Sequence, residues 1–334
     1  MAAVVTRLTQ ADPTACRTAG RCLAGGGLVA FPTETVYGLG ADAANEEAIA
    51  RLYNAAARPL PKPVIVHVRE LAAAQSLARF DDAAEQLARN FWPGPLTLVL
   101  PKTPGCLVGD LATAGRDTIA VRVPNHPIAE GILAALGKPI VAVSAARFGR
   151  LSPTTAGHVL ADMRGRIDLI VNGGPTSVGL ESTIVACLGT PTLLRPGGVT
   201  RDAIESVLGR AITRASRMPA RRKGAGLSLS PDMFASGDAP KAPLRLDATV
   251  VLPGEALLAF GPPPESADQA AMVLNLSPNG DLVEAAANFF SHLRTLDATA
   301  PTGIAVMPIP DKGLGEAIND RLTCATAYQR RRHV

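Results

Sequence analysis

The chain has 334 residues, of which 47% are hydrophobic and 19% are charged, and its formal net charge is +4. This composition excludes a disordered chain, and the length allows two domains with separate cores. The modest positive charge permits an anionic ligand or an RNA partner without requiring one, because nucleic-acid binding depends on clustered charge.

Five cysteines are scattered along the chain and never stand in CxxC spacing. That pattern favours reduced thiols over a disulfide scaffold or a zinc site. No segment reaches the roughly 18 consecutive apolar residues of a membrane helix, and the N-terminus lacks the pattern of a signal peptide. We therefore expect a cytoplasmic protein without membrane contact.

The first strong element is an apolar run that ends at Phe31, and it predicts a buried strand. The strand should stop where the polar stretch PTETVYGLG begins at residue 32. Such a stretch is typical of α/β proteins in which a core strand delivers small polar side chains to a crevice at its carboxyl end. A capped turn into a helix at 46–55, with Asn45 as the cap, is the alternative explanation.

Helical and apolar runs alternate from residue 15 to about residue 210. Helices are predicted at 46–55, 81–91, 127–136 and 200–208. Several apolar runs lie too close together for a helix between them, so we expect an α/β fold with a twisted, open, mixed sheet covered by helices. The runs that predict strands are LVAF, VIVHV, LTLVL, TIAVRV, IVAVSA, LIVNGG, STIVAC and TLLRPG.

The composition changes between residues 211 and 243, where Gly, Pro, Ser and Arg replace large apolar residues. This segment predicts a linker, and its basic cluster from Arg214 to Lys223 fits either a solvated segment or a weak contact with RNA phosphates. Strand, helix, strand and helix patterns follow in residues 244–334 and predict a smaller C-terminal α/β domain. We therefore expect a large domain at 1–210, the linker, and this second domain.

Common nucleotide-binding and hydrolase motifs do not occur: the sequence lacks a Walker phosphate loop, a strand-borne GxGxxG, a GxSxG elbow and HExxH. The five histidines lack metal-ligand spacing, so we expect no metal held by the protein alone. Polar residues instead follow the predicted strands and indicate a crevice with arginines for anionic groups and hydroxyls for orientation. These residues are His67, Thr118, Arg122, Ser144, Ser152, Glu181, Ser182, Thr183 and Arg195.

Seven segments, in this order, resemble the longer, two-domain form of the YrdC-like threonylcarbamoyl-AMP synthases. They are FPTETVYGLGADA, RPLPKPVIVHV, WPGPLTLVL, DTIAVRVP, SAARFGRLSPTTAGHV, GLESTIV and LLRPG. The resemblance implies a YrdC-like catalytic domain and an L-threonylcarbamoyladenylate synthase, a nucleotidyltransferase. Such an enzyme joins L-threonine, bicarbonate or carbon dioxide, and ATP, and releases pyrophosphate. It also implies magnesium bound with the ATP, and a downstream TsaD/Kae-type transferase that places the threonylcarbamoyl group on tRNA.

The same resemblance assigns two groups of site residues. Arg122 is suited to the threonine carboxylate, because its guanidinium binds carboxylates through two parallel hydrogen bonds. Arginines at the nucleotide positions neutralise phosphate charge. The threonine-binding residues are Thr35, His67, Arg122, Ser144 and Ser182, and the ATP-binding residues are Arg58, Lys62, Thr118, Ser152 and Arg195.

Three positions depart from the family pattern. The family usually has Lys at the place of Ala56, Asn at the place of Ala146, and a His-Tyr pair at the place of Gly237-Asp238. All three losses fall on the nucleotide side, and the first two would cost on the order of 2–4 kcal/mol each in transition-state stabilisation if nothing compensates. Lys62 and Arg147 are the nearby cations that would compensate.

These departures leave two alternatives to an efficient synthase open. One is a catalytically weakened paralogue that binds threonine, a nucleotide or RNA without efficient turnover. The other is a paralogue that uses the intact amino-acid pocket for adenylating chemistry outside tRNA modification.

Overall fold

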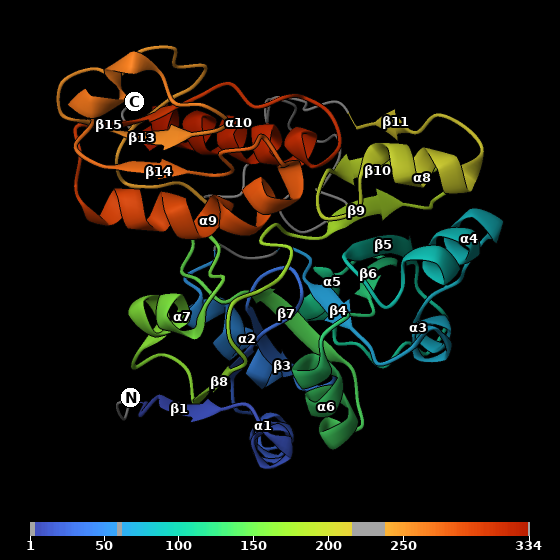
Figure 1. The fold of residues 1–334 in the computed structure, drawn as a ribbon. Helices are drawn as coiled ribbons and strands as arrows, with labels where there is room; N and C mark the ends of the chain where they lie inside the picture. Colours follow the sequence, from blue (N-terminus) through green and yellow to red (C-terminus); the bar gives the residue numbers. More distant parts are fainter. Residues whose placement is uncertain (1–3, 59–61, 216–237, 333–334) are drawn as a thin grey trace.

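The computed structural model describes residues 4–58, 62–215 and 238–332. Within these residues an 11-stranded sheet occupies the first part of the chain, and a 4-stranded sheet occupies the second part (Figure 1). The large sheet mixes parallel and antiparallel neighbours. The predicted fold, a mixed α/β sheet with a smaller C-terminal α/β unit, is confirmed.

The large sheet has the strand order β1-β8-β2-β3-β7-β4-β6-β5-β9-β10-β11. All eight apolar runs that predicted strands contribute a strand to it. The edge strands β1 and β11 were not predicted, and β11 lies beyond the expected end of the large domain at residue 210. The strands are β1 (Arg7–Gln10), β2 (Val29–Phe31), β3 (Gly38–Asp42), β4 (Ile65–His67), β5 (Leu96–Pro101), β6 (Thr118–Arg122), β7 (Ile140–Ser144), β8 (Leu169–Asn172), β9 (Thr183–Ala186), β10 (Thr192–Arg195) and β11 (Thr213–Arg214).

The stretch after Phe31 differs from the expectation in one respect. The strand does stop at Pro32, but the chain returns at once as β3, antiparallel to β2. Glycine allows this pairing because a Cβ at Gly40 would lie 2.7 Å from Cε1 of Phe31 and 2.8 Å from Cγ2 of Ile140. The PTET residues therefore form the connection between two central strands.

The four predicted helices are present, with starts that differ by at most one residue. Asn45 caps α2, since its side chain accepts a hydrogen bond of 3.0 Å from the backbone N–H of Ala48. The cap expected as the alternative explanation therefore exists beside the polar connection. The helices of this part are α1 (Pro13–Ala24), α2 (Glu46–Ala55), α3 (Leu71–Leu77), α4 (Asp82–Phe91), α5 (Asp110–Thr113), α6 (Pro127–Leu136), α7 (Ala156–Met163) and α8 (Arg201–Leu208).

The small sheet is parallel, in the order β12-β15-β13-β14. The apolar run at 244–253 predicted a longer first strand, but only two of its residues pair. The helix α9 lies on the side of the small sheet that faces the large sheet (Figure 1). The elements are β12 (Leu244–Arg245), β13 (Glu255–Ala259), the 3-10 helix η1 (Glu265–Gln269), β14 (Val273–Asn275), α9 (Leu282–Ala298), β15 (Gly303–Val306) and α10 (Leu314–Arg332).

Two large apolar cores support the two sheets. One packs beneath the central strands of the large sheet and contains residues such as Val66, Val121 and Val141. The other packs between the small sheet and its helices, and it includes Phe289 and Phe290 of α9. Within the described part of the chain, no helix is long and apolar enough to cross a membrane.

Candidate active site

A pocket lies against one face of the large sheet. Ile65 and His67 of β4 and Ala142 and Ser144 of β7 line it, as expected for residues two apart, which point to the same face of a strand. We expected a crevice at the carboxyl ends of the strands. Because β7 runs antiparallel to β4, their last residues lie at opposite edges, and the pocket extends across the face instead.

The pocket brings together seven of the ten residues that the sequence assigned to substrates. They come from the β2–β3 connection, the end of α2, the last residues of β4, β6, β7 and β10, and the residue before β9. The seven are Thr35, Arg58, His67, Arg122, Ser144, Ser182 and Arg195.

The other three assigned residues do not line the pocket. Ser152 lies one contact behind its wall, with its Oγ 2.9 Å from Oγ of Ser144. Lys62 places Nζ over the ring of Phe148, 5.6 Å from the centroid. Thr118 begins β6, about 13 Å from Arg122 at the other end of that strand, given roughly 3.3 Å per residue. The assignments of all ten residues remain predictions.

The guanidinium of Arg122 is held on three sides. Nε donates to the carbonyl of Gly94 (3.2 Å), and Nη1 donates to Oγ1 of Thr35 (2.9 Å). Nη2 lies 2.7 Å from Oε1 of Glu34, an ion pair without hydrogen-bond geometry. Hydrogen bonds to Gly94 and Thr35 use two of the five N–H donors of an arginine, so one N–H on Nη1 and those on Nη2 remain for a ligand in the described structure.

The hydroxyl of Thr35 is oriented by its neighbours. Oγ1 of Thr33 donates to the carbonyl of Val36 (2.7 Å), so it cannot also donate to Oγ1 of Thr35, which lies 2.7 Å away. The Thr35 hydroxyl must therefore donate to Thr33 while it accepts from Arg122. What it still offers to the pocket is an acceptor lone pair.

His67 is a buried, neutral imidazole. Burial, followed by the positive charge of Arg122, lowers its pKa from 6.5 to about 3. Its Nδ1 lies 3.3 Å from the carbonyl of Ile65, which can only accept, so the proton sits on Nδ1. Nε2 is therefore a second hydrogen-bond acceptor in the pocket.

Ser144 supplies a third acceptor. Ser152 donates its hydroxyl hydrogen to Oε1 of Glu181 (2.9 Å), so the contact between the two serines requires Ser144 to donate. The lone pairs of the Ser144 oxygen then remain for a ligand. Hydroxyl hydrogens in this wall thus run from Ser144 through Ser152 to the carboxylate of Glu181.

Arg195 and Ser182 form the wall on the side of β9 and β10. Nε and Nη2 of Arg195 donate to the carbonyl of Ser182 at 3.1 and 2.9 Å. Nη2 also donates to Oγ of Ser182 (3.2 Å), which lies 2.8 Å from Oγ1 of Thr97. The guanidinium is thereby fixed at the pocket, where Arg58 adds a second positive charge.

The sequence assigned neither of two buried acids to a substrate. They are Glu34, which pairs with Arg122, and Glu181, which was expected only as a crevice residue and lines the pocket. Each stands inside a quoted motif, PTET or GLEST. A carboxylate next to an apolar stretch indicates that a cation or hydrogen-bond donor is buried beside it, because an unpaired buried charge is costly. The sequence shows such carboxylates, but it does not show which residue pairs with each of them.

The three departures lie near the pocket as far as the structure describes them. Ala56 is fully buried, and its carbonyl accepts a 2.7 Å hydrogen bond from the backbone N–H of Phe148. Ala146 is also buried, and Asp238 lines the pocket. Gly237 lies outside the described residues. Among the described residues, no group of three or more His, Cys, Asp or Glu side chains is arranged to hold a metal ion.

Comparison with known proteins identifies the family. Residues 21–197 match a family profile described as telomere recombination, and residues 199–327 match the threonylcarbamoyl-AMP synthase C-terminal domain. A threonylcarbamoyl-AMP synthase of Bacillus subtilis is 38% identical over 309 residues, which cover 88% of this chain and 88% of that protein. The chain belongs to the threonylcarbamoyl-AMP synthase family.

Two further comparisons extend over nearly the whole synthase chain. A threonylcarbamoyl-AMP synthase of Pyrococcus abyssi is 38% identical over 322 residues, 91% of this chain and 92% of that protein. The crystal structure of P. abyssi Sua5 complexed with L-threonine has a TM-score of 0.85 at 35% identity and covers 98% of both chains. These matches favour a synthase over the catalytically weakened paralogue.

Proposed function

We propose that this chain makes threonylcarbamoyl-AMP from L-threonine, ATP and bicarbonate or carbon dioxide, for threonylcarbamoyladenosine modification of tRNA, and that the pocket around Arg122 is where it does so. The observation that carries the proposal is the donor and acceptor pattern of this pocket. It presents the remaining N–H donors of Arg122 beside three acceptors, namely Thr35, Ser144 and His67. An amino-acid zwitterion offers the complementary set, a carboxylate and an amino group with N–H donors.

The threonine carboxylate binds Arg122 in this proposal, while the acceptors orient its amine and hydroxyl. The orientation of the amine matters because, once deprotonated, its lone pair has to reach the carbon of carbon dioxide. Ser182 completes this side of the pocket. Its hydroxyl is fixed by Thr97 and Arg195, which limits the positions that a ligand hydroxyl can take.

The ATP phosphates bind toward Arg58 and Arg195, which line the pocket and neutralise negative charge. Lys62 is proposed as a third cation for the phosphates. Its Nζ lies over the ring of Phe148, and the backbone N–H of Phe148 donates to the carbonyl of Ala56. Lys62 thereby supplies charge near a position that lacks the family's lysine. Ser152 and Thr118 are also proposed to bind the nucleotide, although neither lines the pocket.

The reaction proceeds in two bond-forming steps. The threonine ammonium group first loses a proton to solvent. The resulting amine attacks carbon dioxide and loses a second proton, which gives an N-carboxylate. An oxygen of that carboxylate then attacks the α-phosphorus, and the bond to pyrophosphate breaks as the new P–O bond forms. Magnesium enters as part of the MgATP substrate, which is consistent with the lack of a protein ligand cluster among the described residues.

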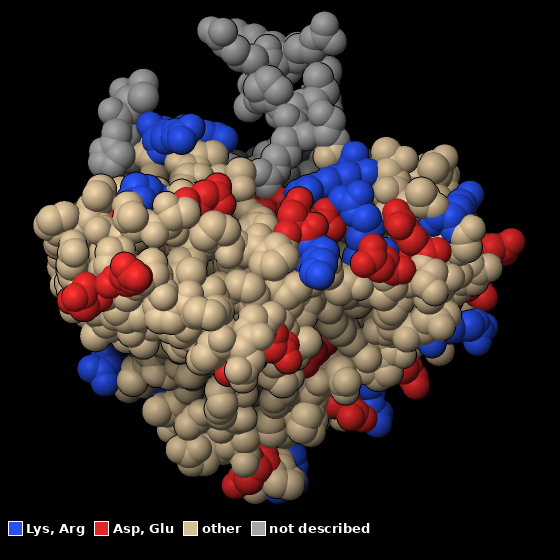
Figure 2. Space-filling view, turned by 45° about the horizontal axis from the view of Figure 1, so that its top comes forward, with Lys and Arg blue, Asp and Glu red and all other residues tan. Residues whose placement is uncertain are grey.

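The product is a mixed anhydride that has to be passed on, so we propose a TsaD/Kae-type transferase as the downstream partner in the cytoplasm. A weak contact with tRNA stays a prediction, because the rest of the basic cluster that suggested it, from Arg217 to Lys223, lies outside the described residues. Arg214, in the basic cluster that suggested RNA contact, is paired with Glu316 and Asp320. On the face in Figure 2, described acidic and basic side chains intermingle without a broad patch of Lys and Arg.

The test is incubation of the protein with L-threonine, bicarbonate, ATP and magnesium, followed by mass detection of the adenylate. We expect threonylcarbamoyl-AMP and pyrophosphate in equal amounts. Threonine binding without any adenylate would overturn the proposal in favour of a non-catalytic binding protein. Adenylate formed from a different amino acid at equal rates would overturn the assignment of the substrate.

A further inference from the structure

The C-terminal domain forms the wall behind the pocket. Three apolar residues from the first part of the chain pack into the core of the small sheet instead of the large one. Each of these apolar residues precedes or follows a polar residue that lies in the pocket wall or directly behind it, so its anchoring also fixes that polar neighbour. The pairs are Val36 beside Thr35, Leu151 beside Ser152, and Leu180 beside Glu181.

Arg294 on α9 binds the backbone at Ser152 directly. Its Nη2 donates to the carbonyl of Leu151 and to Oδ2 of Asp162 (2.6 Å), and its Nε donates to the carbonyl of Ser152 (3.3 Å). Oγ of Ser152 in turn contacts Ser144 in the pocket wall. A lysine could keep the charge but could not reproduce this planar set of donors.

Gly179 brings the loop that carries Glu181 close to α9. Its φ is +72°, and a Cβ there would lie 2.3 Å from the carbonyl oxygen of Ala286 and 2.6 Å from Cα of Ala287. The loop backbone therefore packs directly on the helix backbone. Any movement of α9 would shift the position of Glu181.

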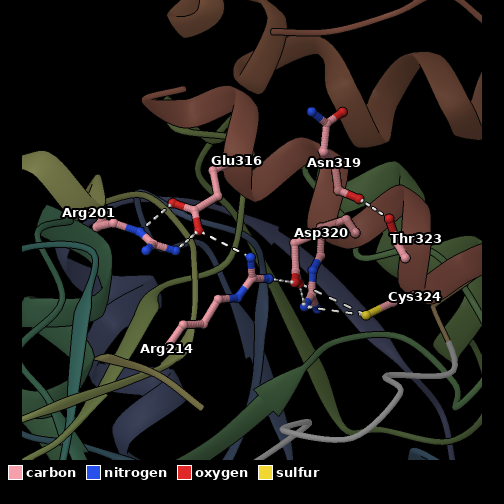
Figure 3. A network of polar contacts seen from close by, with 8 residues as sticks. Arg201, Arg214, Glu316, Asn319, Asp320, Thr323 and Cys324 are labelled. Atoms are coloured by element: carbon pink, nitrogen blue, oxygen red, sulfur yellow. Dashed lines mark hydrogen bonds and ion pairs between the residues drawn. The ribbon is translucent and has the colours of Figure 1, made fainter. Parts of the chain in front are cut away.

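A network of alternating charges on α10 includes Glu316 and Asp320, which contact Arg201 and Arg214 (Figure 3). Asp320 accepts from Arg214 (2.5 Å) and from Arg321. Burial lowers the pKa of Arg321, but nearby negative charges, first that of Asp320 and then that of Glu181, raise it overall. Ion pairs join Arg321 to Asp320, Asp320 to Arg214, Arg214 to Glu316, and Glu316 to Arg201. They connect α10 to α8 and β11 of the first part of the chain.

We propose that Arg294 is a positioning residue through which the C-terminal domain sets the hydroxyl wall of Ser144 and Ser152, and with it the affinity for threonine. Arg294 does not line the pocket. It acts through the backbone of Ser152, whose hydroxyl contacts Ser144 and Glu181. The inference rests on the proposed function in taking L-threonine as the ligand.

The test compares Arg294→Lys with a control variant, Arg245→Met. Arg245 also pairs with a buried glutamate, Glu255, but its contacts stay within the C-terminal domain. Calorimetric titration with L-threonine and steady-state kinetics are measured on the full chain, at a temperature where thermal melts show each variant folded.

For Arg294→Lys we expect the threonine dissociation constant and KM to rise at least fivefold, with a smaller change for ATP. For Arg245→Met we expect less than a twofold change in threonine binding, whatever its melting temperature. Folded Arg294→Lys with wild-type threonine affinity would overturn the inference. Equal weakening by Arg245→Met would also overturn it, since the effect would then be general destabilisation.

Failure of the proposed function is distinguishable from failure of this inference. If the wild type binds threonine but makes no adenylate, the synthase proposal fails. The threonine titrations of Arg294→Lys and Arg245→Met still decide whether the C-terminal domain positions the pocket, because they do not depend on turnover.

Discussion

Arg122 and Glu34 are an ion pair almost closed to water, with side chains 4% and 6% exposed. A buried pair of this kind adds little net stability, because the loss of hydration offsets the attraction between the charges. Its effect is geometric: the guanidinium plane is set before any ligand arrives. Binding a carboxylate then requires less ordering of the side chain than a mobile arginine would.

Replacing Arg122 by alanine should weaken threonine binding by about 2–3 kcal/mol, the scale of losing a hydrogen-bonded charge partner. ATP binding should change much less, because Arg58 and Arg195 remain. Calorimetry with each ligand measures both effects. The double variant Glu34→Gln/Arg122→Ala serves as the control for folding, since it leaves no buried carboxylate unpaired. Unchanged threonine affinity in the folded variants would remove Arg122 from the site.

His67 should make the fold sensitive to acid. In the unfolded chain it binds a proton below pH 6.5, whereas in the folded chain its pKa is lowered to about 3. Between these values the unfolded state holds one more proton, so stability falls as the pH falls. Over 1.5 pH units below 6.5 the loss from this group approaches about 2 kcal/mol.

The variant His67→Gln should lose less stability than the wild type between pH 7 and pH 5, by roughly that 2 kcal/mol. Urea unfolding at the two pH values gives the comparison. The other histidines are common to both proteins and cancel in the difference. Equal losses of stability in the two proteins would mean that the imidazole of His67 is protonated in the folded protein.

Residue types at the pocket were predictable where a motif fixes both the residue and its place after a strand, as for His67 and Arg122. Glu34 and Glu181 were not assigned to a substrate, although each stands in a motif of the family resemblance. Both belong to irregular connections, where the direction of a side chain depends on how the neighbouring strands pair. Those long-range pairings are absent from any local pattern.

At the scale of single elements, β3 shows the limit of local signals. Its sequence, GLGAD, has two glycines, which weaken a strand in isolation. The pairing partners decide otherwise, since β2 and β7 flank it and leave no space for a Cβ at Gly40. The helix at 46–55 was predictable because its cap and its apolar face are both local features.

Gly40→Ala should destabilise the fold by about 1–3 kcal/mol, the usual cost of overpacking a core. Gly38→Ala is the matched control in the same strand. A Cβ there would lie 3.5 Å from its nearest neighbour, Cβ of Ala142, which is an ordinary contact. Denaturant unfolding should therefore separate the two variants. Equal stability would show that Phe31 moves aside without cost.

At the scale of the whole molecule, we propose a catalytic domain at 1–210, a linker at 211–243 and a C-terminal domain at 244–334. Composition suggested these boundaries, but it could not show how the domains meet. The contacts between them join residues more than 100 positions apart, such as Arg294 with Leu151 and Arg201 with Glu316. One of these contacts, between Arg294 and the backbone at Leu151 and Ser152, also supports the pocket wall at Ser144.

Because both apolar and charged groups cross this boundary, the chain should unfold in one cooperative calorimetric transition. Leu180 is fully buried in the core of the C-terminal sheet although it belongs to the first part of the chain. Leu180→Ala should cost about 2–5 kcal/mol and weaken the contact between the domains. We expect its melting curve to broaden or divide into two transitions, and saturating threonine to narrow the separation by stabilising the pocket. Two well-separated transitions already in the wild type would show that the domains fold independently and that the shared core does not couple them.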